Sequence, residues 1–308
     1  MDNLIATLEK KVHALLEQLV FDAELYVISE YHVKMIEEYL EFFSYGLSIL
    51  LKDGEGIFWL EDTKEGLSFV IMPRLVEDIL KKEVFSQAIP FIFSSATLSR
   101  GGDFTYIAKS LGIERFSSFT VASPFDYEEN MKVIGMTESS EGEKWESFGR
   151  SLRKNNGESL VLFNSEEEMN RFREWAKSQQ WEFSILYEGD REISETVASF
   201  QHERSAVLCA YHLWEGLDVP GESLTQVLIS SLPFPPLDPV FQAKRKHAKH
   251  PQEDVDIPYM FLRLRQGIGR LIRSQQDHGL VQIWVTEEEK KKHRHEMEEV
   301  VPVKIMWD

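Results

Sequence analysis

Short apolar runs alternate with longer helical or irregular stretches through the carboxyl-terminal two thirds of the sequence. Six of these runs have the length and composition of buried strands: 132–136, 159–163, 182–186, 206–209, 226–229 and 281–285. Apolar strands that are separated by helices are typical of a parallel sheet with helices on both faces. The pattern therefore predicts an α/β fold built on a doubly wound parallel sheet.

Length and composition narrow the class of protein. A chain of 308 residues is long enough for about two domains. No apolar run reaches the roughly 20 residues that a membrane span needs, and the first turns of the chain carry acidic residues within a helical pattern rather than a signal peptide. A single cysteine, Cys209, excludes an internal disulfide and, by itself, an iron–sulfur cluster or a zinc site. We expect a cytoplasmic protein without a membrane partner.

The charge is strongly negative but unevenly distributed. The net charge of −18 argues against nucleic-acid binding through the charge of the whole protein. Residues 244–273, however, hold eight Lys or Arg against three acidic residues, a local balance of +5 in a chain that is −23 elsewhere. One face is therefore still expected to attract phosphate.

Two basic runs have more than one interpretation. Residues 244–247 either line a nucleic-acid groove or form a solvated helix face, and the second is the more frequent case. Residues 290–295 follow three glutamates, which favours a neutralised surface helix. His293 and His295 lack a carboxylate or cysteine at ligand spacing, so we expect no metal site there.

The amino-terminal part has a different pattern. Apolar residues spaced three and four apart predict two antiparallel helices within 2–43, with Gly46 as the stop signal. Apolar and aromatic runs at 57–60 and 67–72 flank a polar turn and predict a hairpin. A helix at 75–85 and a buried strand at 91–93 are expected to follow.

Polar segments follow several of the predicted strands, at the edge where parallel sheets gather functional loops. After 91–93 come Ser94, Ala96 and Thr97, and small hydroxyl residues at a strand end either contact phosphate or cap a helix. Asn164 and Ser165 follow 159–163, and Ser165 with Glu168 matches a capping box, which favours a structural role. The segment 214–221, Trp-Glu-Gly-Leu-Asp-Val-Pro-Gly, is either a functional loop or an ordinary surface turn.

The segment 266–273, Gln-Gly-Ile-Gly-Arg-Leu-Ile-Arg, carries the strongest local signal. Helical spacing would place Arg270 and Arg273 on one face, with Gln266 one turn earlier. Planar, permanently charged guanidinium groups suit phosphate oxygens, and Gly269 beside them lets another backbone come near. An arginine-rich surface helix with carboxylate partners is the alternative. No acidic residue lies between Ile257 and Gln276, which weakens that alternative.

These segments, in this order, resemble the carboxyl-terminal part of the DinG/XPD-type superfamily 2 DNA helicases. Residues 94–98 are similar to helicase motif III, 123–125 to the segment between the two motor domains, 160–165 to motif IV, 214–221 to motif V and 266–273 to motif VI. The sequence of 214–221 fits the bacterial DinG-like branch best. The resemblance implies a RecA-like second motor domain at 123–308, the last part of a first motor domain at 46–122 and a helical arch remnant at 1–45.

The resemblance also implies roles for single residues. Arg273 would be the arginine finger that reaches the γ-phosphate of ATP, with Arg270 and Gln266 beside it and Gly269 in the same nucleotide-binding segment. Glu215, Gly216 and Asp218 would couple the nucleotide to the DNA track. Thr97 would link hydrolysis to domain movement, and Ser94 and Ala96 beside it would serve this coupling or the contact with nucleic acid. Ser165 and the backbone around Asn164 would contact the phosphates of single-stranded DNA. Translocation in this family runs 5′ to 3′.

Two motifs that a nucleotide site needs are absent from the sequence. There is no G-x-x-x-x-G-K-[ST] to cradle ATP and no Asp-Glu-x-His for Mg²⁺, and the four cluster cysteines of the family are missing as well. We therefore expect half of an ATP–Mg²⁺ site and no iron–sulfur cluster. The partner would be the missing amino-terminal motor half, and the isolated chain would be inactive.

A different class of function stays open at this point. A degenerate motor lobe could act as a non-catalytic adaptor that binds a partner protein and never meets ATP. The presence of Gln266, Arg270 and Arg273 speaks against an adaptor, because an adaptor has no use for a γ-phosphate sensor. A simple single-strand-binding module fits poorly with a net charge of −18.

Overall fold

The computed structural model describes residues 2–24, 30–51, 56–63, 66–74, 76–87, 89–95, 97–99, 101–138, 140–203, 205–219, 221 and 223–308. The chain forms two compact units, which are described separately. The larger unit contains Phe93–Ile107, Phe116–Pro235 and Lys249–Asp308, and the smaller contains Met1–Ile92, Ala108–Arg115 and Pro236–Ala248. Among the described helices, none is both long and apolar enough to cross a membrane.

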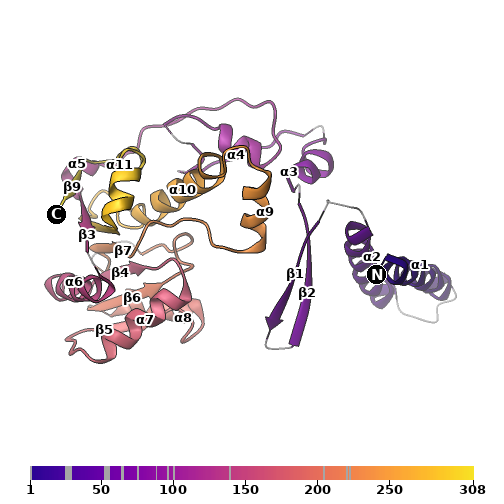
Figure 1. The fold of residues 1–308 in the computed structure, drawn as a ribbon, viewed down its shortest axis with the longest axis horizontal. Helices are drawn as coiled ribbons and strands as arrows, with labels where there is room; N and C mark the ends of the chain where they lie inside the picture. Colours follow the sequence, from indigo (N-terminus) through magenta and orange to yellow (C-terminus); the bar gives the residue numbers. More distant parts are fainter. Residues whose placement is uncertain are drawn as a thin grey trace. The chain divides into compact units, whose positions relative to one another are not determined.

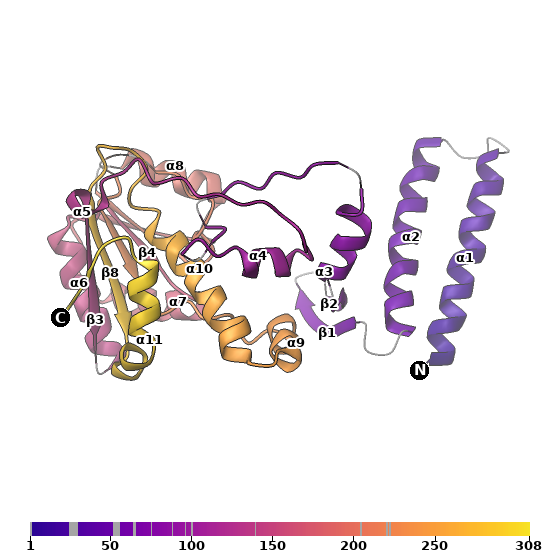
Figure 2. The same cartoon turned by 90° about the horizontal axis from the view of Figure 1, so that it is seen from above.

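A seven-stranded sheet organises the larger unit. Its strands lie in the order β5-β6-β4-β7-β8-β3-β9, and every neighbouring pair is parallel (Figures 1 and 2). The bounds are Met131–Thr137 for β3, Ser159–Leu162 for β4, Ser184–Tyr187 for β5, Ala206–Ala210 for β6, Gln226–Ile229 for β7, Gly279–Val285 for β8 and Ile305–Trp307 for β9. The six predicted strands are all present, although β5 begins two residues later than expected. The predicted RecA-like α/β sheet is confirmed.

Helices cover both faces of the sheet because its strands are apolar on both sides. In β4, Leu160 and Leu162 join one buried cluster, and Val161 joins the other. The first cluster includes residues of α8 (Ile193–His202), α10 (Ile257–Ile268) and α11 (Glu287–Val300), and the second includes residues of α6 (Glu141–Lys154) and α7 (Glu166–Lys177). Shorter helices of this unit are α5 (Tyr127–Asn130) and the π-helical η2 (Gln252–Asp256), and α4 (Thr105–Ser110) is divided between the two units.

The smaller unit contains the predicted helix pair and hairpin. Helices α1 (Asp2–Glu24) and α2 (Glu30–Leu51) lie antiparallel and bury Val12, Leu19, Val33 and Leu47 (Figure 2). Strands β1 (Gly56–Thr63) and β2 (Gly66–Pro73) pair antiparallel, as predicted. The predicted helix at 75–85 is present as α3 (Val76–Ile79) and the π-helical η1 (Leu80–Val84), with Leu75 outside the described residues. The unit also contains α9 (Pro239–His247).

Two expectations for the amino-terminal part are wrong. Gly46 does not end the second helix, because α2 continues to Leu51. Gly46 lies against the hairpin instead, where a Cβ would stand 3.5 Å from Ile71 Cδ1. Residues 91–93 form no strand, and Ile92 is 91% exposed. An apolar run becomes a buried strand only where a neighbouring strand supplies hydrogen-bond partners, and no described strand pairs with this one.

The helical placement of the two key arginines is also wrong. Helix α10 ends at Ile268, with Gly269 as its C-cap, so Arg270 and Arg273 lie in the connection to β8. The edge strand β9 was not predicted, because three residues are too few to show a periodic pattern. The domain boundaries at 45/46 and 122/123 stay predictions.

The close contact between β3 and β9 predicts the effect of a single methyl group. A Cβ on Gly135 would come within 2.4 Å of the Trp307 ring, so Gly135→Ala is expected to lower the free energy of unfolding by about 1–3 kcal/mol through overpacking. Urea denaturation followed by circular dichroism measures this change. Gly142→Ala, on a helix position with open space around the added carbon, is the control and should lose no stability. Equal stability of both variants would contradict the packing.

Candidate functional site

The loop after β6 is anchored by a buried tryptophan. Trp214 is fully buried, and its indole Nε1 donates a hydrogen bond of 2.9 Å to the carbonyl oxygen of Phe163 at the end of β4. Gly267 of α10 lies against the indole, where a Cβ would come within 2.9 Å of the ring. Only glycine allows the helix to approach this closely. The contact fixes the loop between the sheet and α10.

The guanidinium of Arg270 joins this loop to the end of α10. Its Nε donates to the carbonyl oxygens of Trp214 at 2.9 Å and Gln266 at 3.2 Å, and its Nη1 donates to that of Leu217 at 2.6 Å. Arg270 is only 9% exposed. Burial and then repulsion by Arg273 lower the pKa of Arg270 to about 10, against the attraction of Glu215 and Asp218, so the group stays a cation at neutral pH.

Arg273 shares the same loop but stays open to solvent. Its Nη2 donates to the carbonyl oxygen of Leu217 at 3.1 Å, and its Nε lies 3.7 Å from Asp218 Oδ1. The side chain of Arg273 is 32% exposed and that of Asp218 is 78% exposed. A guanidinium in this position is oriented by the protein and still accessible to an anionic ligand.

Two further predicted residues meet at the edge of this cluster. Gln266 donates through Nε2 to Glu215 Oε2 at 3.0 Å. Gly216 follows with a φ of +77°, in the left-handed region that favours glycine. The structure therefore brings Gln266, Arg270 and Arg273 together with the 214–218 loop. Gly269 caps α10 with an ordinary φ of −66°, and its nucleotide-binding role stays a prediction.

Asp277 organises the backbone around Arg273, and the sequence interpretation missed it. Its carboxylate accepts from the backbone N–H groups of Arg273 and Ser274 at 2.7 Å each, from the Ser274 hydroxyl at 2.8 Å and from the Gly221 N–H at 3.2 Å. Burial acts to raise the pKa of Asp277, but these hydrogen bonds outweigh it and the pKa lies below its ordinary value. The spacing Ser274-x-x-Asp277 was the available signal.

Asn164 and Ser165 have structural partners at the end of β4. Asn164 donates through Nδ2 to Ser231 Oγ at 2.9 Å and to the Leu232 carbonyl oxygen at 2.8 Å. The Ser165 hydroxyl accepts from Glu168 N at 3.2 Å and caps α7, as the capping signal predicted. The Glu168 carboxylate accepts from Asn164 N rather than from Ser165 N, and it also pairs with Lys144 at 2.7 Å. Their contact with DNA phosphates stays a prediction.

A hydrogen bond ties the segment after residue 93 to α10. Arg265 of α10 donates through Nη1 to the carbonyl oxygen of Ser99 at 2.6 Å, and burial lowers the pKa of Arg265. Thr97 Oγ1 lies 3.1 Å from Ser95 Oγ, and Ser94 is exposed. Ala96 lies outside the described residues.

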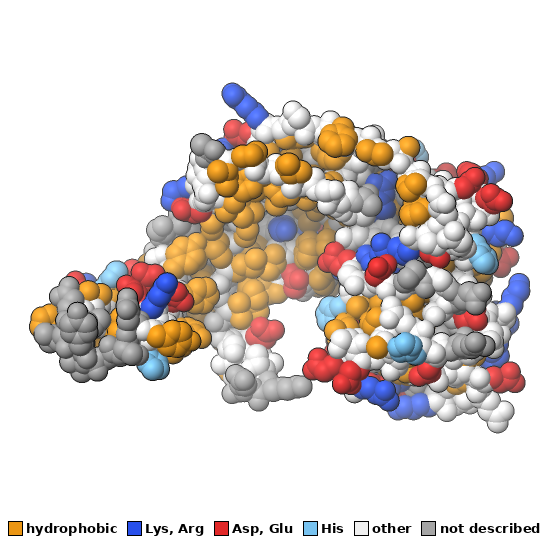
Figure 3. Space-filling model, turned by 180° about the vertical axis from the view of Figure 1, so that it is seen from behind, with side chains coloured by type: hydrophobic (Ala, Val, Ile, Leu, Met, Phe, Trp, Pro, Cys, Tyr) orange, Lys and Arg blue, Asp and Glu red, His pale blue; other side chains and the backbone are white. Residues whose placement is uncertain are grey.

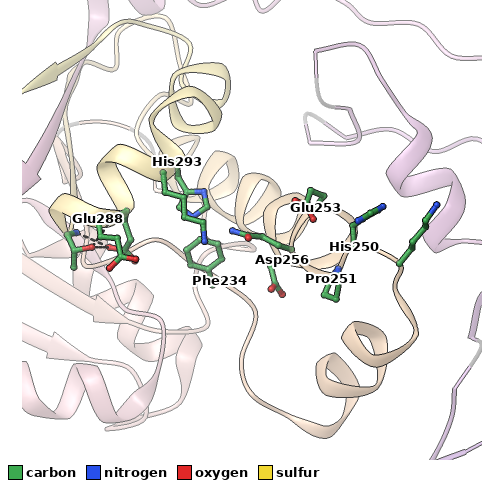
Figure 4. A pocket seen from close by; sticks show the side chains of 12 residues that line it. Phe234, His250, Pro251, Glu253, Asp256, Glu288 and His293 are labelled. Carbon is green, nitrogen blue, oxygen red and sulfur yellow. Dashed lines mark hydrogen bonds between the residues drawn. The ribbon is translucent and has the colours of Figure 1, made fainter.

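Two cavities lie elsewhere on the same unit. One of about 760 Å³ is lined by residues that include Phe234, His250, Asp256 and His293 (Figure 4). A second, of about 260 Å³, is lined by residues after β3, β7 and β8. None of the predicted site residues lines either cavity. Within the described part of the chain, no group of three or more His, Cys, Asp or Glu is arranged to hold a metal ion.

The different burial of the two arginines predicts different effects on stability. Arg270→Met leaves the carbonyls of Trp214 and Gln266 without these charged donors and is expected to cost about 1.5–3 kcal/mol of unfolding free energy. Arg273→Ala removes a solvent-exposed interaction whose acceptor keeps its bond to Arg270, so its cost should stay below about 1 kcal/mol. Chemical denaturation of both variants measures the two losses of unfolding free energy. A larger loss of unfolding free energy in Arg273→Ala than in Arg270→Met would contradict the structural role of Arg270.

Asp277 predicts a pH-dependent contribution to stability. Because the pKa of Asp277 is lowered in the folded state, its carboxylate stabilises the fold above its ordinary pKa near 4, and this contribution is lost as the pH falls through the folded-state pKa. Asp277→Asn places an amide donor against backbone donors and should cost about 1–3 kcal/mol at pH 7. Urea midpoints of both proteins between pH 7 and pH 3 test this. A difference that does not shrink in acid would contradict it.

Comparisons with known proteins find helicases and helicase domains. The sequence profile of the helicase C-terminal domain matches residues 149–303. The probable ATP-dependent helicase YpvA of Bacillus subtilis (strain 168) is 49% identical over 290 residues, which are 93% of this chain and 45% of YpvA. The 3′-5′ exonuclease DinG of the same organism is 29% identical over 255 residues, which are 74% of this chain and 27% of DinG. The chain thus spans less than half the length of these relatives.

A solved XPD helicase structure shows the same fold. The matched region is 95% of this chain and 55% of the XPD chain, with a TM-score of 0.58 and 19% sequence identity. The helicase C-terminal domain profile alone matches half of the sequence and includes both the 214–218 loop and the segment 266–273. This chain therefore belongs to the helicase C-terminal domain family, on the DinG/XPD-like branch of the superfamily 2 helicases.

Proposed function

We propose that this chain supplies the second motor domain of an ATP-dependent DNA helicase, with Arg273 as the arginine finger. The observation that carries the proposal is the contrast between Arg270 and Arg273, which both bind the 214–218 loop. Arg270 is buried on backbone carbonyls, whereas Arg273 is held on the same loop with its side chain 32% exposed. A pre-oriented and permanently charged group suits the charge that develops in phosphoryl transfer.

The residues present fit one side of an ATP site. When bound, ATP–Mg²⁺ supplies the phosphoryl group and the charge that positions it. Arg273 would bind the terminal phosphate and stabilise its developing negative charge, a contribution worth roughly 10³–10⁵ in rate for arginine fingers. Arg270 would hold the loop in place, and Gln266 with Gly269 would adjoin the nucleotide. Because Arg273 would make this contact only while ATP is present, hydrolysis would favour domain opening.

The other half of the site would come from an amino-terminal motor half. The chain lacks G-x-x-x-x-G-K-[ST] and Asp-Glu-x-His, and its relatives are more than twice as long as the part that matches it. The hairpin also has an uncovered apolar face. Phe58, Leu60, Leu67 and Phe69 share that face by register and are 39–70% exposed. Exposed hydrophobic side chains also cover a broad area of the view in Figure 3.

The remaining predicted residues would couple ATP to DNA. Glu215, Gly216 and Asp218 lie on the loop that Arg270 anchors, so movement at the nucleotide would reach that loop directly. The Arg265–Ser99 bond would connect Ser94, Ala96 and Thr97 to α10 in the same way. Ser165 and the backbone around Asn164 would contact single-stranded DNA, with a phosphate oxygen taking the place of the Glu168 carboxylate at Asn164 N. We propose 5′ to 3′ translocation in cytoplasmic DNA repair or replication.

A reconstitution experiment tests this function. The isolated chain is expected to hydrolyse no ATP. Joined to the amino-terminal region of YpvA from Bacillus subtilis, it should show hydrolysis that single-stranded DNA stimulates. Arg273→Ala should lower that hydrolysis by roughly 10³-fold or more. Arg294→Ala, which removes an exposed arginine paired with Glu298 on α11, is the control and should leave hydrolysis unchanged.

Two outcomes would contradict the proposal. Hydrolysis by the isolated chain would show that it contains a complete site. Equal activity of wild type and Arg273→Ala in the joined protein would remove the finger and favour a non-catalytic adaptor. The stability measurements on Arg273→Ala separate either outcome from misfolding.

A further inference from the structure

Helix α9 presents a group of basic side chains that none of the five sequence motifs includes. The helix begins after Asp238, whose Oδ1 accepts from Phe241 N at 2.7 Å, and continues with a proline in its first turn. Its last turn carries Lys244, Arg245, Lys246 and His247. Between Asp238 and Glu253 the sequence contains no acidic residue. We refer to Lys244, Arg245, Lys246 and His247 as the α9 basic cluster.

Ion pairs neutralise some of the basic side chains of this protein. The chain has 52 acidic residues against 34 Lys and Arg, and several basic side chains on other helices form ion pairs. Examples are Lys177 with Glu174 at 2.6 Å, and Arg171 with Glu141 at 2.7 Å. In the part of the chain that the structure describes, Lys244 and Lys246 have no such pair. Lys244 instead lies 5.2 Å from the ring centroid of Phe241.

The other two members of the cluster are held by structural contacts. Arg245 donates through Nη1 to the carbonyl oxygen of Pro236 at 3.3 Å. His247 Nε2 lies 3.0 Å from Arg74 Nη1, so the cation of Arg74 adds to the positive charge of the cluster. Basic residues near a helix carboxyl terminus gain stability from the helix dipole. That gain accounts for cations in the last turn, but not for the absence of acidic residues on both sides of it.

We infer that the α9 basic cluster binds the phosphate backbone of single-stranded nucleic acid, with Lys244 and Lys246 as the contacting groups. This inference rests on the proposed function, because a helicase must hold a polyanion with a protein whose own net charge is −18. Exposed ammonium groups on flexible stems neutralise phosphates without reading the bases. The contact is therefore independent of sequence and sensitive to salt.

Salt titration of binding measures the contact directly. A labelled oligothymidylate is titrated with the chain at several salt concentrations, and log K is plotted against log salt concentration. For single strands each neutralised phosphate contributes about 0.7 to the slope, so Lys244→Gln/Lys246→Gln should make the slope shallower by about 1.4. Lys10→Gln/Lys11→Gln removes the same charge from exposed positions of α1 and should leave the slope unchanged. Circular dichroism checks that all three proteins are folded.

Each outcome decides between distinct possibilities. Loss of slope in the α9 variant alone supports the inference. Binding by the wild type with the same slope in both variants overturns the inference but leaves the proposed function intact. No binding by the wild type at low salt overturns both this inference and the proposed DNA contact of this chain. Tighter binding of labelled poly-glutamate than of oligothymidylate, lost in the α9 variant, would assign the cluster to an acidic protein instead.

Discussion

The buried guanidinium of Arg270 holds the candidate site together. The loop after β6 has no regular secondary structure, so its carbonyl groups find no partners in a helix or sheet when the loop is buried. Arg270 donates to two of them, at Trp214 and Leu217, and to Gln266 at the end of α10. These bonds compensate the cost of burying a cation, and the fixed donor geometry of arginine makes them possible together. Lysine could not replace it.

Different residues of the candidate site position the loop and reach the solvent. Trp214 and Arg270 fix the position of the loop, and Asp277 fixes the backbone of Arg273 by accepting its N–H group. The side chain of Arg273 is then the part of this network that reaches solvent as a cation. A group that touches a reacting phosphate needs such fixed neighbours, because a small misplacement costs much of its effect.

The sheet could be predicted from the sequence, whereas the detailed path around Arg273 could not. Runs such as 160–162 are apolar on both faces, and only a covered parallel sheet buries both. The spacing of Gln266, Arg270 and Arg273 fits a helix equally well, but the carbonyls of the Trp214 loop attract Arg270 beyond the helix end. That competition is tertiary and leaves no local pattern. The strand predicted at 91–93 is absent for a similar reason, because a strand needs a neighbouring strand, and the local sequence pattern does not show whether one is present.

Asp218 explains how a strongly acidic protein can keep an arginine available for phosphate. Its carboxylate is 3.7 Å from Arg273 Nε and 78% exposed, and an ion pair of that kind contributes little to stability in water. In the proposed function, a phosphate oxygen would replace Asp218 as the partner of Arg273, and the released carboxylate would return to water at little cost. Arg270 could not exchange partners in this way, because its acceptors are buried backbone carbonyls. The exchangeable partner therefore lies on the same loop that would connect the nucleotide to DNA.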